Sequence, residues 1–405
     1  MSLPTPLINR GRAETVLQRF GVSAMVLADP VNIYYATGFW PQTLVMGHLG
    51  SSIAVVPADQ SLPVTLITAQ FLHYFFDLDD VPAGSPLQIK LYTAPDQDGE
   101  NAMPPFFFSS AKDGAEDPWE RATRASTLAQ LEAHPAFPTS VAALQAVLAQ
   151  IGGQVATDND VSGAILGGGS HVSAEPMLRR IRMIKSVHEI GLMRTAAQTN
   201  CEAVQAALAS VKPGDRYTDL QAAFFGETGR RGGKPVFMSV DHTSYRQRGG
   251  VITGGRAFSI DAVASYAGYH GDYGRTILVG EPTRALRGAL DAAILCNDAV
   301  AARLGPGMRY SDVSAIGREA LAKAGHEIFT PAAPHSVGLF HTDEAFKDDA
   351  LSFVKDDHLI EENMVLSVDC PMLQTDMGGT VHMEDLWLIT ANGCESLNDL
   401  SLIHI

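Results

Sequence analysis

The first residues of this chain whose types and spacing could do chemistry are two aspartates in one segment that is expected to form a pair of strands. Asp261 and Asp272 lie in AFSIDAVASYAGYHGDYGRTILVG (257–280), which alternates like two strands joined by a Gly-containing turn. If the turn centres on Tyr266 and Ala267, the two carboxylates lie opposite each other, with Cβ atoms roughly 4.5–5.5 Å apart. Carboxylates this close repel unless a cation or a shared proton neutralises them. The pair therefore predicts a metal site.

A second acidic pair follows on neighbouring strand-like segments. NMVLSVDCPML (363–373) is typical of a strand that ends at Asp369, and TVHMEDLWLIT (380–390) of a strand that carries Glu384. Between the two pairs lies HSVGLFH, in which His335 stands before a Gly-containing turn. Oxygen-rich sites of this kind suit Mn, Mg or Ca, and a nearby histidine extends the choice to Fe, Co or Zn.

A short repeat links the two halves that carry these pairs. PGDRYTDL (213–220) returns as PGMRYSDV (306–313), and in both copies a Pro-Gly stop is followed by Thr218 or Ser311, placed to cap a new helix. One short match is weak evidence of duplication, but a similar offset separates the acidic pairs. We therefore expect two related α/β halves that each deliver one acidic pair to a shared centre.

Length and charge limit the kinds of partner. A chain of 405 residues is longer than one hydrophobic core usually serves, so two domains are expected. The formal net charge of −16 repels nucleic acid and anionic membranes, which leaves a small molecule or short peptide as the expected partner. Four widely separated cysteines, no signal-peptide pattern and no long apolar run favour a reduced, cytoplasmic protein.

The elements that must position the acidic residues follow an α/β pattern. Apolar periodicity predicts helices at 12–20 and 141–151 and one long helix over 179–211, which ends at Pro213. Three short apolar runs are typical of buried strands: 24–27, 52–56 and 64–67. Residues 94–118 are rich in Asp, Pro, Gly and Ser and predict a surface loop. We expect domains at 1–175 and 176–405.

The order Asp, Asp, His, acid, Glu, with the strings IDAVASYAGYHGDYGRT, PHSVGL and HMEDLWLIT, resembles the creatinase/prolidase/aminopeptidase P superfamily. RRIRMIKSVHEIGLMRTAA looks like the helix that opens its catalytic domain, and DPVNIYYATGF looks like part of its N-terminal domain. The resemblance covers nearly the whole chain. It implies an α+β fold: a creatinase/prolidase-type N-terminal α/β domain, followed by a pita-bread catalytic domain with duplicated α/β halves around an antiparallel sheet.

The resemblance also implies a ligand set and an activity. Asp261 would hold one metal ion, Asp272 and Glu384 would bridge two, and His335 and Asp369 would complete the second. The family's chemistry is hydrolysis of an amide or peptide bond through a metal-activated hydroxide, in Xaa-Pro dipeptidases and aminopeptidases P. We expect one or two divalent ions per chain, manganese first, with cobalt, zinc or iron as alternatives, and a homodimer.

The chain departs from the family pattern around the expected centre. Asp369 stands where the family has Glu, and it is the expected proton carrier. The second histidine of the family falls on Thr342, but His341 lies one residue earlier and could donate to an oxyanion. His382 replaces a family arginine, and His242 is the nearest match to an upstream histidine; we predict that both contact substrate.

These departures keep other interpretations open. The same fold hosts non-peptidase chemistry, such as creatinase-like or ectoine-hydrolase-like cleavage of C–N bonds and a metal-using lyase, and it also serves as a binding module without activity. Asp261, Asp272 and Glu384 could be solvated acids, and His335 and His341 could be ordinary loop histidines. The retention of groups able to ligate at all five positions favours a metallohydrolase.

Overall fold

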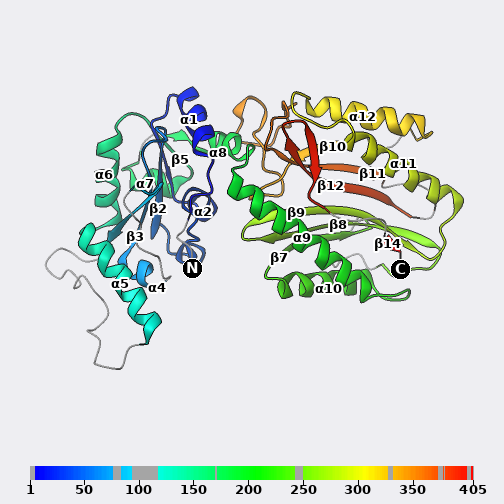
Figure 1. The fold of residues 1–405 in the computed structure, drawn as a ribbon, viewed down its shortest axis with the longest axis horizontal. Helices are drawn as coiled ribbons and strands as arrows, with labels where there is room; N and C mark the ends of the chain where they lie inside the picture. The colour runs from blue at the N-terminus through cyan, green and yellow to red at the C-terminus, as the bar shows by residue number, and fades with distance from the viewer. Residues whose placement is uncertain are drawn as a thin grey trace. The chain divides into compact units, whose positions relative to one another are not determined.

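The computed structural model describes residues 5–75, 84–93, 117–168, 171–241, 250–326, 332–372, 377, 379–398 and 403–404. It divides into two compact units, Met1–Ile181 and Arg182–Ile405, which are described separately (Figure 1). Most of the loop predicted at 94–118 lies outside the described residues, as does His242. None of the described helices is both long enough and apolar enough to span a bilayer.

The first unit is a six-stranded mixed sheet with helices packed on it (Figure 1). The strands run in the order β4-β3-β2-β1-β5-β6: β1 Ala24–Leu27, β2 Ser52–Pro57, β3 Val64–Ala69, β4 Leu87–Tyr92, β5 Val155–Thr157 and β6 Val172–Ser173. The helices are α1 Arg10–Arg19, α2 Pro30–Thr37, α3 Gln42–Val45, α4 Gln70–Phe75, α5 Pro118–Ala133, α6 Ser140–Ile151, α7 Asp160–Ile165 and α8 Glu175–Arg182. The α/β layer and its three apolar strands are confirmed.

The second unit is a largely antiparallel sheet with a helix pair along each half (Figure 1). Its main strand order is β10-β11-β12-β9-β8-β7: β7 Lys234–Val240, β8 Arg256–Tyr266, β9 Tyr269–Val279, β10 Ala333–Ser336, β11 Val365–Met372 and β12 Val381–Thr390. Two short strands add to it, β13 Gly393–Ser396 beside β12 and β14 Ile403–His404 beside β9. The helices are α9 Val187–Ala209, α10 Tyr217–Arg230, α11 Arg284–Ala301, α12 Tyr310–Lys323 and the short 3₁₀ helix η1 Lys347–Asp349.

Each helix pair closes its own hydrophobic core. Helices α9 and α10 pack on β7–β9 in a cluster that includes Val204, Phe224 and Ile260. Helices α11 and α12 pack on β10–β12 in a cluster that includes Leu290 and Val368. Two equivalent cores on one sheet are the arrangement expected of duplicated halves.

The short repeat has the same backbone geometry in both halves. Gly214 and Gly307 have φ angles of 101° and 91°, the left-handed region that favours glycine. The predicted caps are wrong by two residues: Arg216 and Arg309, not Thr218 and Ser311, precede the two helices. In each copy an aspartate three residues later accepts a hydrogen bond from the cap N–H, at 3.1 and 2.8 Å. The aspartates of the repeat therefore do the capping.

The helix predicted over 179–211 is two helices. Helix α8 ends at Arg182, and α9 begins at Val187 behind a capping box in which Ser186 and Glu189 bond each other's backbone N–H. This S-x-x-E pattern is a start signal that apolar periodicity alone passes over. The break places Arg182 and Lys185 in the interior of the second unit, both 2% exposed or less.

The hairpin that carries the first acidic pair has a different register from the one predicted. Its turn is at Ala267 and Gly268, which both have positive φ, as a two-residue hairpin turn requires. Asp261 is consequently opposite Gly274, not Asp272. The two carboxylates still share a face, because Asp272 lies two residues before Gly274 on β9.

Candidate metal centre

Three of the predicted ligands lie in one row across four strands. Asp369 on β11 is directly opposite Glu384 on β12, Glu384 is opposite Gly274 on β9, and Gly274 is opposite Asp261 on β8. Directly opposed side chains point to the same face of a sheet. The row therefore collects three carboxylates from both halves of the repeat, with a glycine gap between Glu384 and Asp261.

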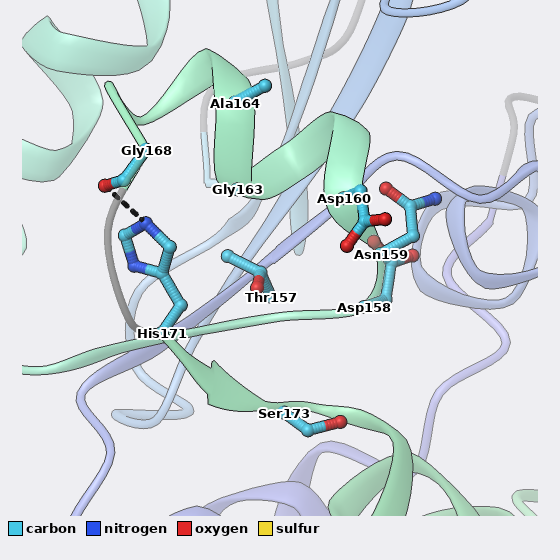
Figure 2. A pocket seen from close by; sticks show the side chains of 9 residues that line it. All are labelled: Thr157, Asp158, Asn159, Asp160, Gly163, Ala164, Gly168, His171 and Ser173. Atoms are coloured by element: carbon cyan, nitrogen blue, oxygen red, sulfur yellow. Dashed lines mark hydrogen bonds between the residues drawn. The ribbon is translucent and has the colours of Figure 1, made fainter.

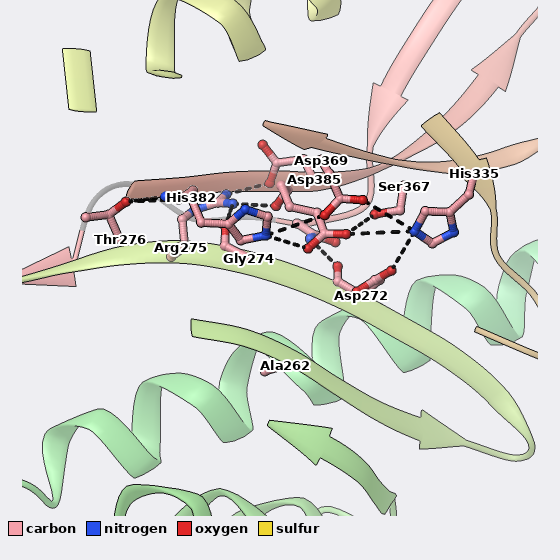
Figure 3. A network of polar contacts seen from close by, with 12 residues as sticks. Ala262, Asp272, Gly274, Arg275, Thr276, His335, Ser367, Asp369, His382 and Asp385 are labelled. Carbon is pink, nitrogen blue, oxygen red and sulfur yellow. Dashed lines mark hydrogen bonds and ion pairs between the residues drawn. The ribbon is translucent and has the colours of Figure 1, made fainter. Parts of the chain in front are cut away.

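His335 and Asp272 lie beside this row. His335 is opposite Ser367, two residues before Asp369 on β11. Its Nε2 is 3.6 Å from Asp272 Oδ2, 3.6 Å from Asp369 Oδ2 and 4.0 Å from Glu384 Oε1 (Figure 3). The five residues predicted as ligands are thus brought together. Their donor atoms form groups close enough to hold ions, among them Asp261–Asp272–Glu384 and His335–Asp369–Glu384.

His341 also reaches the cluster, although it is one residue out of the family's place. Its Nε2 is 3.1 Å from Asp272 Oδ2, and its ring centroid is 4.9 Å from that of His335. The side chain is 35% exposed and faces the cavity described below. It is therefore placed to contact both a ligand carboxylate and a bound molecule.

Buried charges hold the loop that carries His335 and His341. The guanidinium of Arg182 donates to Asp343 at 2.7 Å, and both side chains are fully buried. Asp343 also accepts from the backbone N–H of Leu339. Glu344 accepts from the backbone N–H of Ser336, directly after His335. Because these bonds are shielded from water, they position the loop more firmly than surface ion pairs would.

His382 lies behind the carboxylates. It is 4% exposed, its Nε2 is 3.1 Å from Glu384 Oε2 and 3.6 Å from Asp369 Oδ1, and it is not among the described residues that line the cavity. This placement does not fit the substrate contact predicted for it. His242, the other residue predicted to contact substrate, lies outside the described residues.

The raised pKa values of the clustered carboxyl groups indicate a site that binds cations. Burial, followed by repulsion from Glu384, raises the pKa of Asp261 to about 7. Burial and like charges raise the pKa of Asp369 and of Glu384 to about 8, and that of Asp272 well above its usual range. Burial lowers the pKa of His335 to about 3, so its ring is neutral and able to ligate.

Carboxylate oxygens without hydrogen-bond partners also indicate a cation site. Among the described residues, Asp261 Oδ1 and Asp272 Oδ1 are buried and have no hydrogen-bond partner. Buried carboxylate oxygens without a partner are costly unless an ion binds them. The donor set, with carboxylate oxygens and imidazole nitrogens, fits divalent Mn, Fe, Co or Zn.

The cluster opens into a cavity of about 290 Å³. Asp261, Asp369, Glu384 and His335 form part of its wall, and Phe353 and Lys355 line it as well. Lys355 is the only Lys or Arg among the lining residues that the structure describes. Lys355 is therefore the residue, among the described ones that line the cavity, best suited to bind a negatively charged group of a bound molecule.

A larger cavity, of about 580 Å³, lies in the first unit and lacks such chemistry (Figure 2). One of its two aspartates, Asp158, already accepts from the backbone N–H groups of Ala28 and Asp29 and from the Asn32 amide. His171, on its wall, contacts the Gly168 carbonyl at 3.1 Å. With their bonding groups engaged, these residues serve the fold of the first unit.

The raised pKa values predict an unusual pH dependence for the metal-free protein. An unfolded carboxyl group has a pKa near 4, so between about pH 4 and pH 8 the folded state binds more protons than the unfolded state. The free energy of unfolding therefore falls as pH rises through this window. We expect the chelator-treated protein to have a lower Tm at pH 8 than at pH 6, and manganese to shrink the difference.

Asp261→Asn provides the internal control for this prediction. It removes one of the repelling carboxylates, so the loss of Tm between pH 6 and pH 8 should be smaller than in the parent protein. An equal loss in the two chelator-treated proteins would contradict the assignment of the effect to this cluster.

Sequence reasoning missed some residues of the site. Ser367 donates to Glu384 Oε1 at 2.7 Å, and its position two residues before Asp369 on the same strand is a signal that alternation offers. The same alternation places His382 on the face of Glu384. Lys355 has no local signal, because it lies in an irregular segment whose course only the fold determines.

Comparisons with known proteins agree with this architecture. Residues 191–391 match the model of metallopeptidase family M24. The Xaa-Pro dipeptidase of Pyrococcus horikoshii is 28% identical over 232 residues, which cover 55% of this chain and 64% of the relative. The chain thus spans just under two thirds of that relative's length.

Solved structures extend the similarity of fold. Prolidase from Pyrococcus furiosus matches with a TM-score of 0.64 at 18% identity, covering 96% of this chain and 99% of that one. The Xaa-Pro dipeptidase from Bacillus anthracis matches with a TM-score of 0.67 at 16% identity, covering 98% and 99%. The expected pita-bread fold with its N-terminal α/β domain is confirmed. Residues 191–391 therefore match a family M24 metallopeptidase domain, within a chain that has the fold of the solved prolidase and Xaa-Pro dipeptidase.

Proposed function

We propose that this protein is a divalent-metal-dependent peptidase that hydrolyses Xaa-Pro dipeptides. The observation that carries the proposal is the group of Asp261, Asp272, Asp369 and Glu384 with His335 at the wall of a cavity, in which Asp272 and Glu384 are buried. The relatives it matches include proteins named Xaa-Pro dipeptidase. Manganese is the ion we propose, one or two per chain, with cobalt, zinc or iron as alternatives.

Different residues of the chain have separate roles in such a reaction. Divalent ions, when bound, polarise a carbonyl and lower the pKa of water. His341, partly exposed to the cavity, donates its N–H to the oxygen that gains negative charge, a contact worth about 10²–10³ in kcat where it is preorganised. Asp369, on the cavity wall, is the residue we propose to hold and pass a proton.

Non-peptidase chemistry on this fold is not favoured. The creatinase-like, ectoine-hydrolase-like and lyase alternatives remain consistent with a changed motif, but the named relatives are dipeptidases and aminopeptidases. A binding module without activity would not require the intact ligand set. The four free cysteines, Cys201, Cys296, Cys370 and Cys394, support the cytoplasm as the compartment we propose, and a homodimer remains our proposal for assembly.

The function is tested by metal content and hydrolysis together. The purified full chain is loaded with manganese and desalted, its metal is measured by mass spectrometry, and Xaa-Pro dipeptides are compared with longer Xaa-Pro peptides. Bound metal and faster cleavage of the dipeptides support the proposal. A chain that binds no divalent ion would overturn it.

The position of Lys355 is a physical reason to expect a preference for dipeptides. Its ammonium group donates to the Pro334 carbonyl at 3.2 Å, next to His335, and lines the cavity. A dipeptide brings its C-terminal carboxylate to within a residue of the scissile bond, where this ammonium can bind it. We expect Lys355→Met to raise KM for dipeptides about tenfold, the equivalent of one charge-assisted hydrogen bond, while kcat changes little.

Two controls make this prediction specific. Lys347→Met removes a lysine from nearby η1 that does not line the cavity, and should leave KM unchanged. With C-terminally amidated substrates, the parent protein and Lys355→Met should have similar KM values. If Lys355→Met weakens amidated and free dipeptides equally, the lysine does not bind the carboxylate.

A further inference from the structure

His382 and His335 face different oxygens of the same two carboxylates. Nε2 of His335 is nearest to Asp369 Oδ2 and Glu384 Oε1, whereas Nε2 of His382 is nearest to Asp369 Oδ1 and Glu384 Oε2. In Figure 3 the two rings lie on opposite sides of Asp369. The carboxylate pair is thus flanked by an imidazole nitrogen on each side.

Strand register produces this arrangement. On β11, Ser367 lies opposite His335 and Pro371 lies opposite His382, so the two histidines are two residues to either side of Asp369. His382 and Glu384 share a face of β12 because they are two residues apart. The position of His382 therefore follows from the sheet and does not depend on a loop.

A glycine makes room for the His382 ring. A Cβ atom on Gly274 would lie 2.2 Å from both Cδ2 and Nε2 of His382, closer than any real contact. The ring therefore lies over the glycine gap in the row of carboxylates, between Glu384 and Asp261. Any residue with a side chain at position 274 would displace it.

The distances match those of ligands that share an ion. Atoms that coordinate one ion at about 2.0–2.2 Å lie about 3–4 Å from each other. The His382 contacts of 3.1 and 3.6 Å fall in this range, as do those of His335 to Asp272 and Asp369. Nε2 of His382 is closer to its nearest carboxylate oxygen than Nε2 of the expected ligand His335 is. The His382 side chain is also the more buried of the two.

We propose that His382 binds a divalent ion directly through Nε2, so that the centre has one imidazole nitrogen on each side of the Asp369–Glu384 pair. The inference rests on the proposed function only in requiring that the centre binds metal. Imidazole nitrogen suits Co, Zn and Fe better than Mn. His382 therefore shifts the preference of the centre toward those ions.

The alternative role for His382 is to donate a hydrogen bond that orients Glu384. His382→Gln separates the two roles, because a glutamine amide keeps an N–H donor but supplies no imidazole nitrogen. His358→Gln is the matched control. His358 is also buried in the second unit, but its Nε2 contacts the Ala345 carbonyl at 2.8 Å and not the carboxylates.

The experiment is proton NMR of the cobalt-loaded full chain. The ring N–H of a histidine that ligates paramagnetic Co²⁺ is shifted far from the normal range, and each ligating histidine gives one such exchangeable signal. Among the described residues, Nδ1 of His382 is buried without a partner, so its proton is protected from solvent exchange. We expect His382→Gln to lose one shifted signal and His358→Gln to lose none.

Metal affinity gives a second readout that does not depend on activity. The ratio of cobalt affinity to manganese affinity should fall about tenfold or more in His382→Gln, in line with the effect of altering the ligand environment of a metal. If the cobalt-loaded parent and His382→Gln have the same number of shifted signals, the inference is wrong and the proposed function stands. If the parent binds no cobalt or manganese, both fail.

Discussion

Glu384→Gln is expected to lower kcat/KM for an Xaa-Pro dipeptide by about a thousandfold or more, because a divalent centre contributes several kcal/mol to the transition state and each 1.36 kcal/mol is tenfold. Glu384 is central to the row of carboxylates. One of its oxygens accepts from Ser367 and faces His335, and the other faces His382. Glutamine keeps the shape but replaces a ligating oxygen with an N–H donor, so bound metal should fall below that of the parent protein.

The thermal stability of the metal-free Glu384→Gln variant should not fall with its activity. In the metal-free protein Glu384 repels Asp272, and its pKa is raised to about 8 by burial first and by that repulsion second. Removing the charge relieves part of this cost, so the metal-free variant should have a Tm at neutral pH equal to or above that of the metal-free parent. An activity loss accompanied by a gain in Tm cannot be due to unfolding.

Glu395→Gln is the matched control for this prediction. Glu395 lies on β13, opposite Leu388 of the same strand that carries Glu384, but its side chain is 46% exposed and pairs with Arg194. Neither metal content nor kcat/KM should change in this variant. Glu384→Gln protein that retains parental metal content and turnover would show that the carboxylate is not a ligand.

The residue types of the centre could be predicted because alternation along a strand is a local property. Asp261, Asp272, Asp369 and Glu384 all occur in apolar strand-like runs, where an acid on the inner face has few roles besides chemistry. The pairing of Asp261 with Asp272 was wrong because register depends on the turn. A two-residue turn at Ala267 and Gly268 moves the partner of Asp261 to Gly274.

The role of His382 could not be predicted because it depends on the neighbouring strand. Its spacing from Glu384 indicates a shared face, but only the pairing of β12 with β9 shows that Gly274 leaves room for the ring. A residue without a side chain gives no signal of its own as part of a site. The contacts of His382 and the absent side chain of Gly274 therefore have to be considered together.

Asp385, next to Glu384 in the sequence, has a structural role that its position in the sequence does not indicate. In the fold it points to the other face, is 5% exposed and accepts from Arg275 and from Asn297 at 2.8 Å. Adjacent acids on one strand therefore have separate roles, one in the centre and one in the packing behind it.

Arg275→Met is expected to lower the free energy of unfolding by about 3–5 kcal/mol, the usual cost of removing one partner from a buried ion pair. Arg275 is 2% exposed, pairs with Asp385 and donates to the backbone carbonyl of Glu384 at 2.6 Å. Its guanidinium carbon also lies 4.2 Å from the centroid of the Tyr273 ring. The substitution leaves the Asp385 carboxylate buried with Asn297 as its one neutral partner. It also removes the hydrogen bond from Arg275 to the backbone of the strand that carries Glu384.

Urea denaturation distinguishes this effect from that of an ordinary ion pair. Arg194→Met breaks the exposed pair with Glu395 and should cost no more than about 1 kcal/mol. Arg275→Met combined with Asp385→Leu should be more stable than Arg275→Met alone, because no charge is then left buried without its partner. Because Glu384 loses a backbone anchor, the manganese affinity of Arg275→Met should also fall, by about tenfold. If Arg275→Met and Arg194→Met were equally stable, the buried pair would not hold the sheet beneath the metal centre.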